Sequence, residues 1–348
     1  MAKPIVVTGA AGFIGRNIVA ELNRRGHTDL ILVDLLGADD KWKNLVGLRY
    51  EDLLSPEAYL KQVLDGTAPE AEAVIHMGAC SATTERNADY LLENNYRYTR
   101  RLCEWCLRRN TRLVYASSAA TYGDGSRGYS DSDEATPGLQ PLNMYGYSKH
   151  MFDLWAMKRG LLDRIVGLKY FNVYGPYEGH KGDMRSVVEK AYGQILSRGY
   201  LELFKSDRPD YADGEQKRDF IYVRDIVNIT LHFAEHKERG GLFNCGTGKA
   251  RTWKDLAKAV FAAMNKPVDI RYIDMPPQLR GKYQYFTQAE SAKLRAAGYT
   301  QPFTELEDGV QRIFAAVDPV IAGHFAAMRD GFLDLASRPN KAPGGYCE

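Results

Sequence analysis

The sequence predicts an α/β protein with a doubly wound parallel sheet and a smaller, mostly C-terminal α/β lobe. Two observations support this fold class. Short β-branched runs alternate with stretches of helical periodicity through the first half of the chain, and a glycine-rich turn follows the first run. This alternation is typical of parallel sheets with helices on both faces, whose ligands bind at the carboxyl ends of the strands.

The predicted elements follow one another in βα order. Strands are expected at 5–7, 30–33, 73–75, 113–115 and 165–170, and helices at 14–25, 87–109, 145–160, 186–198, 224–236 and 253–264. A loop is expected after the second strand, and loops rich in Gly, Pro and Asp are expected at 174–185 and 205–219.

The composition is that of an ordinary globular protein, with 45% hydrophobic and 26% charged residues in a chain of 348. A net charge of +2 gives no basic excess for nucleic acid. There is no signal peptide and no long apolar span, so we expect a cytoplasmic protein without a membrane partner. The five cysteines lack metal-ligand spacing, so no metal site is expected.

The turn at 9–15 has the pattern GxxGxxG and joins the first strand to the first helix. Gly9 allows the tight turn, Gly12 allows close approach to a pyrophosphate, and Gly15 allows the helix to pack on the strand. Phe13 and Ile14 lie between the last two glycines, at a helix N-terminus whose free N–H groups attract phosphate. The motif predicts a dinucleotide site in a sheet of the Rossmann type.

Two charged residues bear on the choice of dinucleotide. Asp34 ends the second strand, where a carboxylate can accept a hydrogen bond from a ribose 2′-hydroxyl and so favours NAD. Lys41 follows in the next loop and could instead bind the 2′-phosphate of NADP. The spacing leaves both cofactors open. After the expected strand at 73–75, Met77 is followed by the small residues Gly78 and Ala79, which suit a backbone that passes beside the cofactor.

A tyrosine and a lysine predict proton transfer. Tyr145 and Lys149 are four residues apart on an expected helix, so their side chains leave the same face. We expect the ammonium to lower the pKa of the phenol toward that of a general base. Ser118, at the end of the preceding strand, can hydrogen-bond the reacting oxygen of a substrate.

With these three side chains in place, the chain resembles the extended short-chain dehydrogenase/reductase family. It is most similar to the sugar-nucleotide epimerases of that family that act on ADP-heptose in lipopolysaccharide-core synthesis. The resemblance runs from residue 3 to about 317. It rests on the segments 78–85, 94–96, 117–123, 145–149, 170–176, 178–182, 217–220 and 286–288.

The resemblance implies that a bound NADP oxidises C6 of the heptose and then returns the hydride to the opposite face. It assigns acid-base roles to Tyr145 on one side of the carbonyl and Lys181 on the other. It implies a homo-oligomer that binds an ADP-heptose substrate. It also implies that Asn94 and Val173 contact the cofactor, and that the substrate is bound by Asn172, Phe204, Arg218 and Tyr283.

The same comparison suggests a division into domains. We expect an NADP-binding domain at 1–170, to which segments at about 220–250 return, and a mainly substrate-binding lobe at 171–317. Residues 318–348 form a C-terminal extension without an assigned role.

The sequence departs from the family pattern at four positions. Leu35 and Pro56 replace residues that favour NADP, and Asp183 and Lys190 stand near the expected substrate site. Two alternatives remain open. One is another NAD(P)-dependent sugar-nucleotide epimerase or a dehydratase, although 119–121 lacks the acidic pair of a dehydratase. The other is a nicotinamide-binding protein without catalytic activity.

Overall fold

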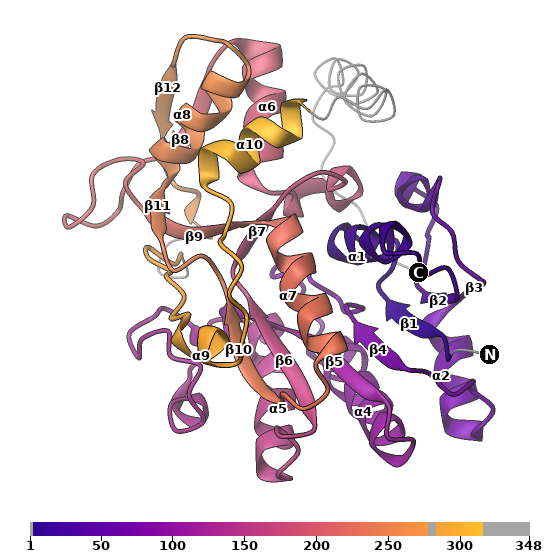
Figure 1. Cartoon of the computed structure of the whole chain (residues 1–348). Coiled ribbons are helices and arrows are strands. Elements are labelled where there is room, and N and C mark those ends of the chain that lie inside the picture. The colour runs from indigo at the N-terminus through magenta and orange to yellow at the C-terminus, as the bar shows by residue number, and fades with distance from the viewer. Residues whose placement is uncertain (1–2, 278–282, 316–348) are drawn as a thin grey trace.

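The structure is a computed structural model, and it describes residues 3–277 and 283–315. The expected extension at 318–348 lies outside these residues. Figure 1 shows a large sheet flanked by helices, with a smaller lobe above one end of it. The predicted α/β fold class is confirmed.

The large sheet contains seven parallel strands in the order β10-β6-β5-β4-β1-β2-β3. The order reverses between β1 and β4, and in open α/β sheets the ligand binds at such a point. The strands are β1 Ile5–Thr8, β2 Leu30–Val33, β3 Asp52–Leu54, β4 Ala73–His76, β5 Arg112–Ser118, β6 Ile165–Tyr170 and β10 Gly241–Cys245.

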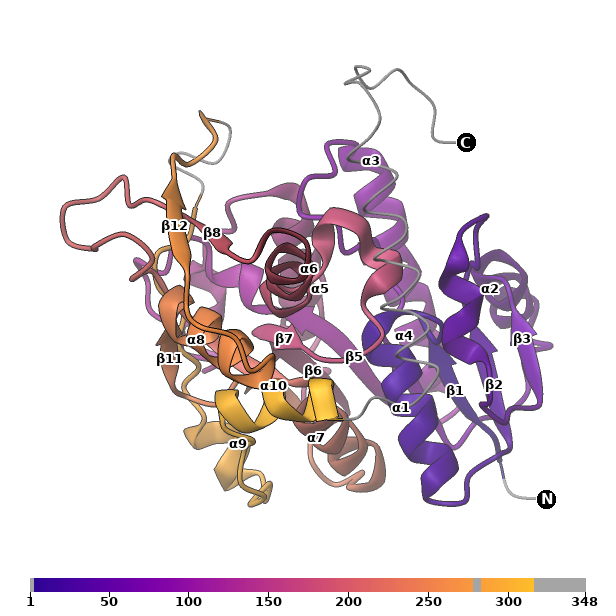
Figure 2. The same cartoon turned by 90° about the horizontal axis from the view of Figure 1, so that it is seen from above.

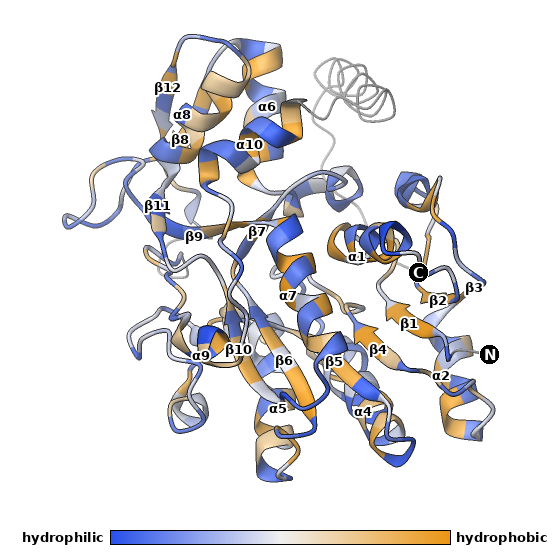
Figure 3. Cartoon of the chain, viewed as in Figure 1, coloured by the Kyte–Doolittle hydropathy of each residue, from blue (hydrophilic) through white to orange (hydrophobic). Residues whose placement is uncertain are grey.

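Alternate side chains of each strand enter two separate cores. Val7 and Val114 pack with α1 and α7, whereas Val6 and Leu113 pack with α2, α4 and α5. Because both faces are covered, most residues of these strands are apolar, as the orange stretches of β1, β4, β5 and β6 in Figure 3 show. The helices are α1 Phe13–Arg24, α2 Pro56–Asp65, α3 Ala88–Leu91, α4 Tyr98–Arg108, α5 Met144–Lys158 and α7 Val223–Glu235.

The smaller lobe is built mostly from the second half of the chain and lies beside the carboxyl ends of the large sheet (Figure 2). Its two sheets have the orders β12-β8 and β11-β9-β7. Its elements are β7 Asn172–Tyr174, α6 Val187–Arg198, β8 Leu201–Phe204, β9 Lys217–Tyr222, β11 Ala250–Thr252, α8 Trp253–Ala263, β12 Ile270–Ile273 and α10 Leu306–Ala315. The short helix α9, Ala292–Ala296, contacts β10.

The structure differs from the expected elements in several places. The predicted helix at 87–109 contains a π-helix at Leu92–Arg97, which turns the buried Asn95 toward Cys80 and Ser148, where its side chain forms hydrogen bonds. Three expected loop regions are partly ordered: Asp40–Leu45 and Gly179–Met184 are 3₁₀ helices, and β9 begins at Lys217. Further 3₁₀ turns lie at Ala119–Tyr122 and Thr136–Gly138. In the parts of the chain described, no helix is long and apolar enough to cross a membrane.

A buried ion pair joins helix α5 to the large sheet near the carboxyl ends of β5 and β6. The Asp153 carboxylate accepts hydrogen bonds from Tyr115 and Ser117 at 2.8 Å and from Lys169 Nζ at 2.9 Å. The side chains of Asp153 and Lys169 are fully buried. Removing one partner of such a pair leaves an uncompensated charge in a low-dielectric environment.

We therefore expect Asp153→Ala to lower the free energy of unfolding by about 3–5 kcal/mol, measured by urea denaturation. The matched control is Asp65→Ala, because Asp65 pairs with Lys61 at the surface. That change should cost less than about 1 kcal/mol. Equal losses in the two variants would contradict this account.

Candidate active site

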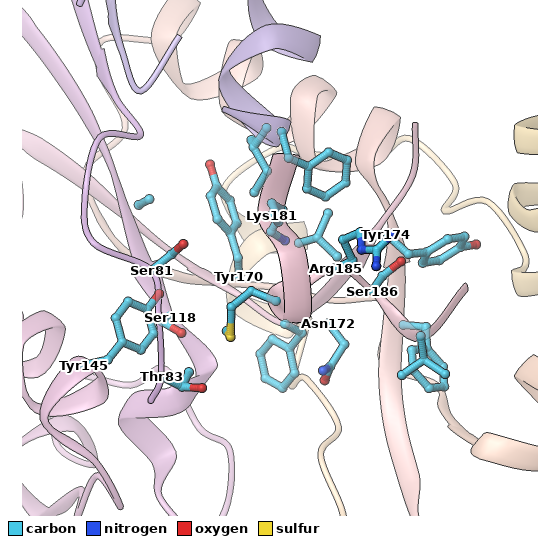
Figure 4. Close-up of a pocket in the computed structure, with 18 of the residues that line it drawn as sticks. Ser81, Thr83, Ser118, Tyr145, Tyr170, Asn172, Tyr174, Lys181, Arg185 and Ser186 are labelled. Carbon is cyan, nitrogen blue, oxygen red and sulfur yellow. The ribbon is translucent and has the colours of Figure 1, made fainter. Parts of the chain in front are cut away.

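A cavity of about 370 Å³ opens between the carboxyl ends of the large sheet and the smaller lobe. Its lining includes the ends of β4, β5 and β6, the start of α5, strand β7 and the segment 181–188. Figure 4 shows Ser118 and Tyr145 on one side of this cavity and Lys181, Arg185 and Ser186 on the other. The cavity therefore brings together groups from both parts of the molecule.

Ser118 ends β5 and Tyr145 lies at the start of α5, where the Ser118 hydroxyl acts on the Tyr145 phenol. Tyr145 lies in the first turn of α5, which begins after Asn143, whose side chain accepts a hydrogen bond from Gly146 N at 2.8 Å. Lys149 follows one turn later, is buried, and donates from Nζ to the Ala116 carbonyl at 2.9 Å. All three predicted groups line the same cavity.

The electrostatics differ from the expectation. Burial raises the pKa of Tyr145 above its ordinary value, and the hydrogen bond with Ser118 offsets only part of this effect. Burial lowers the pKa of Lys149 to about 8, although Asp153 acts in the opposite direction. The prediction that Lys149 lowers the pKa of Tyr145 is therefore wrong for this arrangement, in which desolvation is the larger effect.

Lys181 lies on the 3₁₀ helix Gly179–Met184 and lines both this cavity and the adjoining one at the glycine turn. Its Nζ atom is 3.3 Å from Glu178 Oε2 and 5.1 Å from the centre of the Phe13 ring. Lys181 thus lies where the two cavities meet.

The adjoining cavity, of about 490 Å³, lies at the glycine turn, where the sequence predicts a dinucleotide, and is called the dinucleotide cavity below. Gly9 has a φ of +65°, and a Cβ atom there would lie 2.7 Å from Gly78 N; at Gly15 a Cβ atom would lie 2.0 Å from the Gly9 carbonyl oxygen. Helix α1 starts after Gly12, so no side chain caps its first N–H groups within the described chain. The turn leaves these donors for a phosphate. The other predicted residues that line this cavity are Phe13, Ile14, Asp34, Lys41, Met77, Gly78 and Ala79.

Asp34 and Lys41 form an ion pair at one end of this cavity. Lys41 Nζ lies 2.6 Å from Asp34 Oδ1, which also accepts a hydrogen bond from Leu35 N. Asp34 Oδ2 accepts from Ala11 N at 2.8 Å. Asn94 lines a smaller cavity next to this pair, and Pro56 lies there as well.

The predicted substrate residues divide into two groups. Asn172 and Val173, the second of which was expected at the cofactor, line the cavity from β7. Phe204, Arg218 and Tyr283 instead form a cluster in the smaller lobe, in which the Arg218 guanidinium lies 5.0 Å from the centre of the Tyr283 ring. Arg218 is buried and donates to the backbone carbonyls of Lys217 and Gln284. Trp253 links this cluster to the cavity. It lines the cavity, and the centre of its ring lies 5.7 Å from the guanidinium carbon of Arg218.

His180, which lines the dinucleotide cavity, and its neighbour Asn44 were not assigned to the site from the sequence. The buried Asn44 donates from Nδ2 to the Ala11 carbonyl at 2.8 Å and lies 3.1 Å from His180 Nδ1. His180 lines the cavity, and burial, together with Lys41 and Lys181, lowers its pKa to about 4. No local pattern relates these residues, because the fold alone brings them together. Within the described residues, no group of three or more His, Cys, Asp or Glu side chains is placed to hold a metal ion.

Glu189, on the first turn of α6, is a carboxyl group with unusual titration. Its side chain is 7% exposed, Oε1 has no hydrogen-bond partner among the described residues, and Arg185 Nη1 is 3.9 Å away. Burial and the nearby charge of Glu178 raise its pKa from 4.5 to about 7. Between these two pH values the folded protein binds a proton that the unfolded chain does not, so stability falls as the pH rises through this window.

Glu189→Gln should remove this loss. At pH 8 we expect the variant to exceed the wild type in free energy of unfolding by up to about 3 kcal/mol, and at pH 5 the two should nearly coincide. Urea denaturation at both pH values measures the difference. A stability difference that is the same at pH 5 and pH 8 would refute the assignment.

The chain matches known proteins over most of its length. Residues 5–246 match the model of the NAD dependent epimerase/dehydratase family. The chain is 57% identical to an ADP-L-glycero-D-manno-heptose-6-epimerase of Nitratidesulfovibrio vulgaris over 90% of this chain and 99% of that protein. It is 47% identical to the protein of the same name from Fusobacterium nucleatum, over 88% of this chain and 96% of that protein.

Solved structures share the fold. The ADP-L-glycero-D-manno-heptose-6-epimerase of Helicobacter pylori aligns with a TM-score of 0.76 at 24% identity, covering 91% of this chain and 97% of that one. The UDP-glucose 4-epimerase of Thermotoga maritima, solved with UDP-glucose, aligns with a TM-score of 0.73 at 25% identity, covering 90% and 97%. On its motifs, its cavity and these matches, the chain belongs to the NAD dependent epimerase/dehydratase family.

Proposed function

We propose that the protein interconverts ADP-D-glycero- and ADP-L-glycero-D-manno-heptose by transient oxidation at C6, a step in the synthesis of lipopolysaccharide-core precursors. The observation that carries the proposal is the placement of the Ser118–Tyr145 pair and Lys181 on two sides of one cavity beside the glycine turn. The 57% identity with an ADP-heptose epimerase supports the choice of substrate.

The reaction needs a proton donor or acceptor on each face of the C6 carbonyl. The glycine turn and the residues that line the adjoining cavity would hold a nicotinamide dinucleotide, which would supply hydride exchange at C6. Ser118 holds the C6 oxygen, and Tyr145 exchanges a proton with it on one face. Lys181 does the same on the other face. The ammonium groups of Lys149 and Lys181 favour the developing alkoxide because they act within a partly desolvated cavity.

The lining of the cavity favours an epimerase over a dehydratase. The described lining residues include two lysines and Arg185 but no aspartate or glutamate. A dehydratase must remove a proton from carbon, and a carboxylate near the serine usually does so. The intact Ser118, Tyr145 and Lys149 group likewise speaks against a protein that binds nicotinamide without catalysis.

The proposed cofactor is NADP. The Asp34 carboxylate accepts three hydrogen bonds, one of them from Lys41 Nζ, so a ribose 2′-hydroxyl would share this carboxylate with the ammonium group. Lys41 places an ammonium group beside this position, where it can bind a 2′-phosphate. The expected homo-oligomer and the cytoplasmic location stay predictions.

The activity is tested with purified protein and ADP-D-glycero-D-manno-heptose. NMR should show conversion to the L-epimer, while absorbance at about 340 nm shows no net NADPH formation. Tyr145→Phe should lower kcat about 10²–10⁴-fold, because it removes a positioned acid-base group.

The matched control is Tyr147→Phe, since Tyr147 lies on the same helix and is 48% exposed. That variant should retain the wild-type rate. Absence of interconversion by the wild type with saturating cofactor would refute the proposed function.

The cofactor is identified from the nucleotide released when the purified protein is denatured, and we expect a 2′-phosphate. Lys41→Ala should weaken NADP binding about 10–100-fold, because it removes a charge-assisted hydrogen bond, and should change NAD binding less than about threefold. Calorimetric titration measures both affinities. Lys43→Ala, in the same 3₁₀ helix but paired with Asp40, is the control and should bind NADP normally. Equal weakening for NAD and NADP would contradict the role of Lys41.

A further inference from the structure

The ammonium group of Lys181 must be fixed by a partner if it is to act at one position in the cavity. A lysine side chain is long and flexible, and fixing it costs up to about 2 kcal/mol of conformational entropy. The side chain of Lys181 is 24% exposed, so its surroundings hold it only in part. Its ammonium group lies 3.3 Å from Glu178 Oε2, and this contact determines where the charge lies.

Glu178 is suited to hold that charge because its own carboxylate is fixed. The side chain is fully buried, and Oε1 accepts a hydrogen bond from Gly175 N at 3.2 Å. Oε2 accepts from Ser186 N at 2.8 Å as well as from Lys181. The two backbone donors orient the carboxylate, and the ammonium group supplies the counter-charge that a buried carboxylate requires.

The backbone on which Glu178 stands is fixed in turn by the cofactor helix α1. Arg16 lies with its guanidinium carbon 3.7 Å from the centre of the Tyr177 ring, and Asn17 donates to the Pro176 carbonyl at 3.3 Å. Tyr177 has a φ of +76°, which is rare for a residue with a side chain. Strained residues of this kind cluster at functional sites, where surrounding contacts maintain them.

We propose that Glu178 is the positioning residue for Lys181. Its fixed carboxylate holds the ammonium group at the junction of the dinucleotide cavity and the cavity that Ser118 and Tyr145 line. Glu178 itself does not line the described cavity and so does not contact the substrate. The role rests on the proposed function, because it acts through the acid-base group on the second face of the carbonyl. The Arg16–Tyr177 contact extends this support to the helix that binds the dinucleotide.

A purely structural role makes a different prediction. Through the hydrogen bonds that its carboxylate accepts, Glu178 also connects Gly175, just after β7, with Ser186, just before α6. If these two hydrogen bonds were the only role of Glu178, replacing Glu178 would disturb the cavity whether or not Lys181 is present. The effects of changing Glu178 and Lys181 would then multiply.

The experiment is a double-mutant cycle on kcat and KM for the ADP-heptose interconversion, with dinucleotide content and Tm recorded for each protein. Lys181→Met should lower kcat at least about 100-fold. Glu178→Gln should lower kcat about 10–100-fold with KM nearly unchanged. The double variant should be no more than about twofold slower than Lys181→Met, because Glu178 has no group left to position.

Glu189→Gln serves as the matched control, because it removes a neighbouring buried carboxyl group that does not hydrogen-bond Lys181 among the described contacts. This control should keep the wild-type kcat. Multiplying losses in the double variant, an equal loss in Glu189→Gln, or full activity of Lys181→Met would overturn the role of Glu178. An inactive wild type would instead refute the proposed function, so the two failures are distinguishable.

Discussion

The close approach of three backbone segments at the first glycine turn determines how the rest of the site is arranged. A side chain at Gly9 would collide with Gly78, and one at Gly15 would collide with Gly9. Thr8 strengthens this junction, because its hydroxyl group accepts a hydrogen bond from Gly78 N at 3.0 Å. With β1 and β4 held together in this way, helix α1 begins directly over the point where the strand order reverses. The cavity at the glycine turn, the segment 176–178 and the cavity that Ser118 and Tyr145 line all lie around this junction.

The charges of the site are arranged in two layers. The cations Lys149 and Lys181 line the cavity, and a buried carboxylate stands behind each of them, Asp153 for the first and Glu178 for the second. This arrangement keeps carboxylates out of the described lining of the cavity, while the buried carboxylates compensate the cations. Glu178 binds its lysine directly, whereas Asp153 binds Lys169 and acts on Lys149 through space. The Lys149 side of the cavity is therefore held by contacts with β5 and β6, and the Lys181 side by the carboxylate of Glu178 in the loop after β7.

Local sequence patterns predicted the features that depend on neighbouring residues in the chain. The βα alternation predicted the sheet, and the spacing of Tyr145 and Lys149 predicted that they line one cavity. Features that depend on burial could not be read in this way. The sequence predicted a lowered pKa for Tyr145, whereas burial raises it. That prediction was wrong because desolvation arises only from the complete fold. The contact of Asn44 with His180 and the π-helix around Asn95 also depend on partners distant in the sequence. The short strands β7, β8, β11 and β12 were not predicted, because they lie in the second half of the chain, where the alternation of strand and helix patterns weakens.

The place of β10 in the large sheet affects how the chain can fold during synthesis. This strand pairs along β6, but the sequence between the two carries much of the smaller lobe. At about 5–20 residues per second, the edge of β6 waits several seconds for its partner to be translated. During that interval an apolar strand has unpaired backbone groups, which are a template for association with other chains. The topology therefore leaves this edge of β6 unpaired until residues 241–245 have been synthesised, and any contact that covers the edge during that interval would reduce such association.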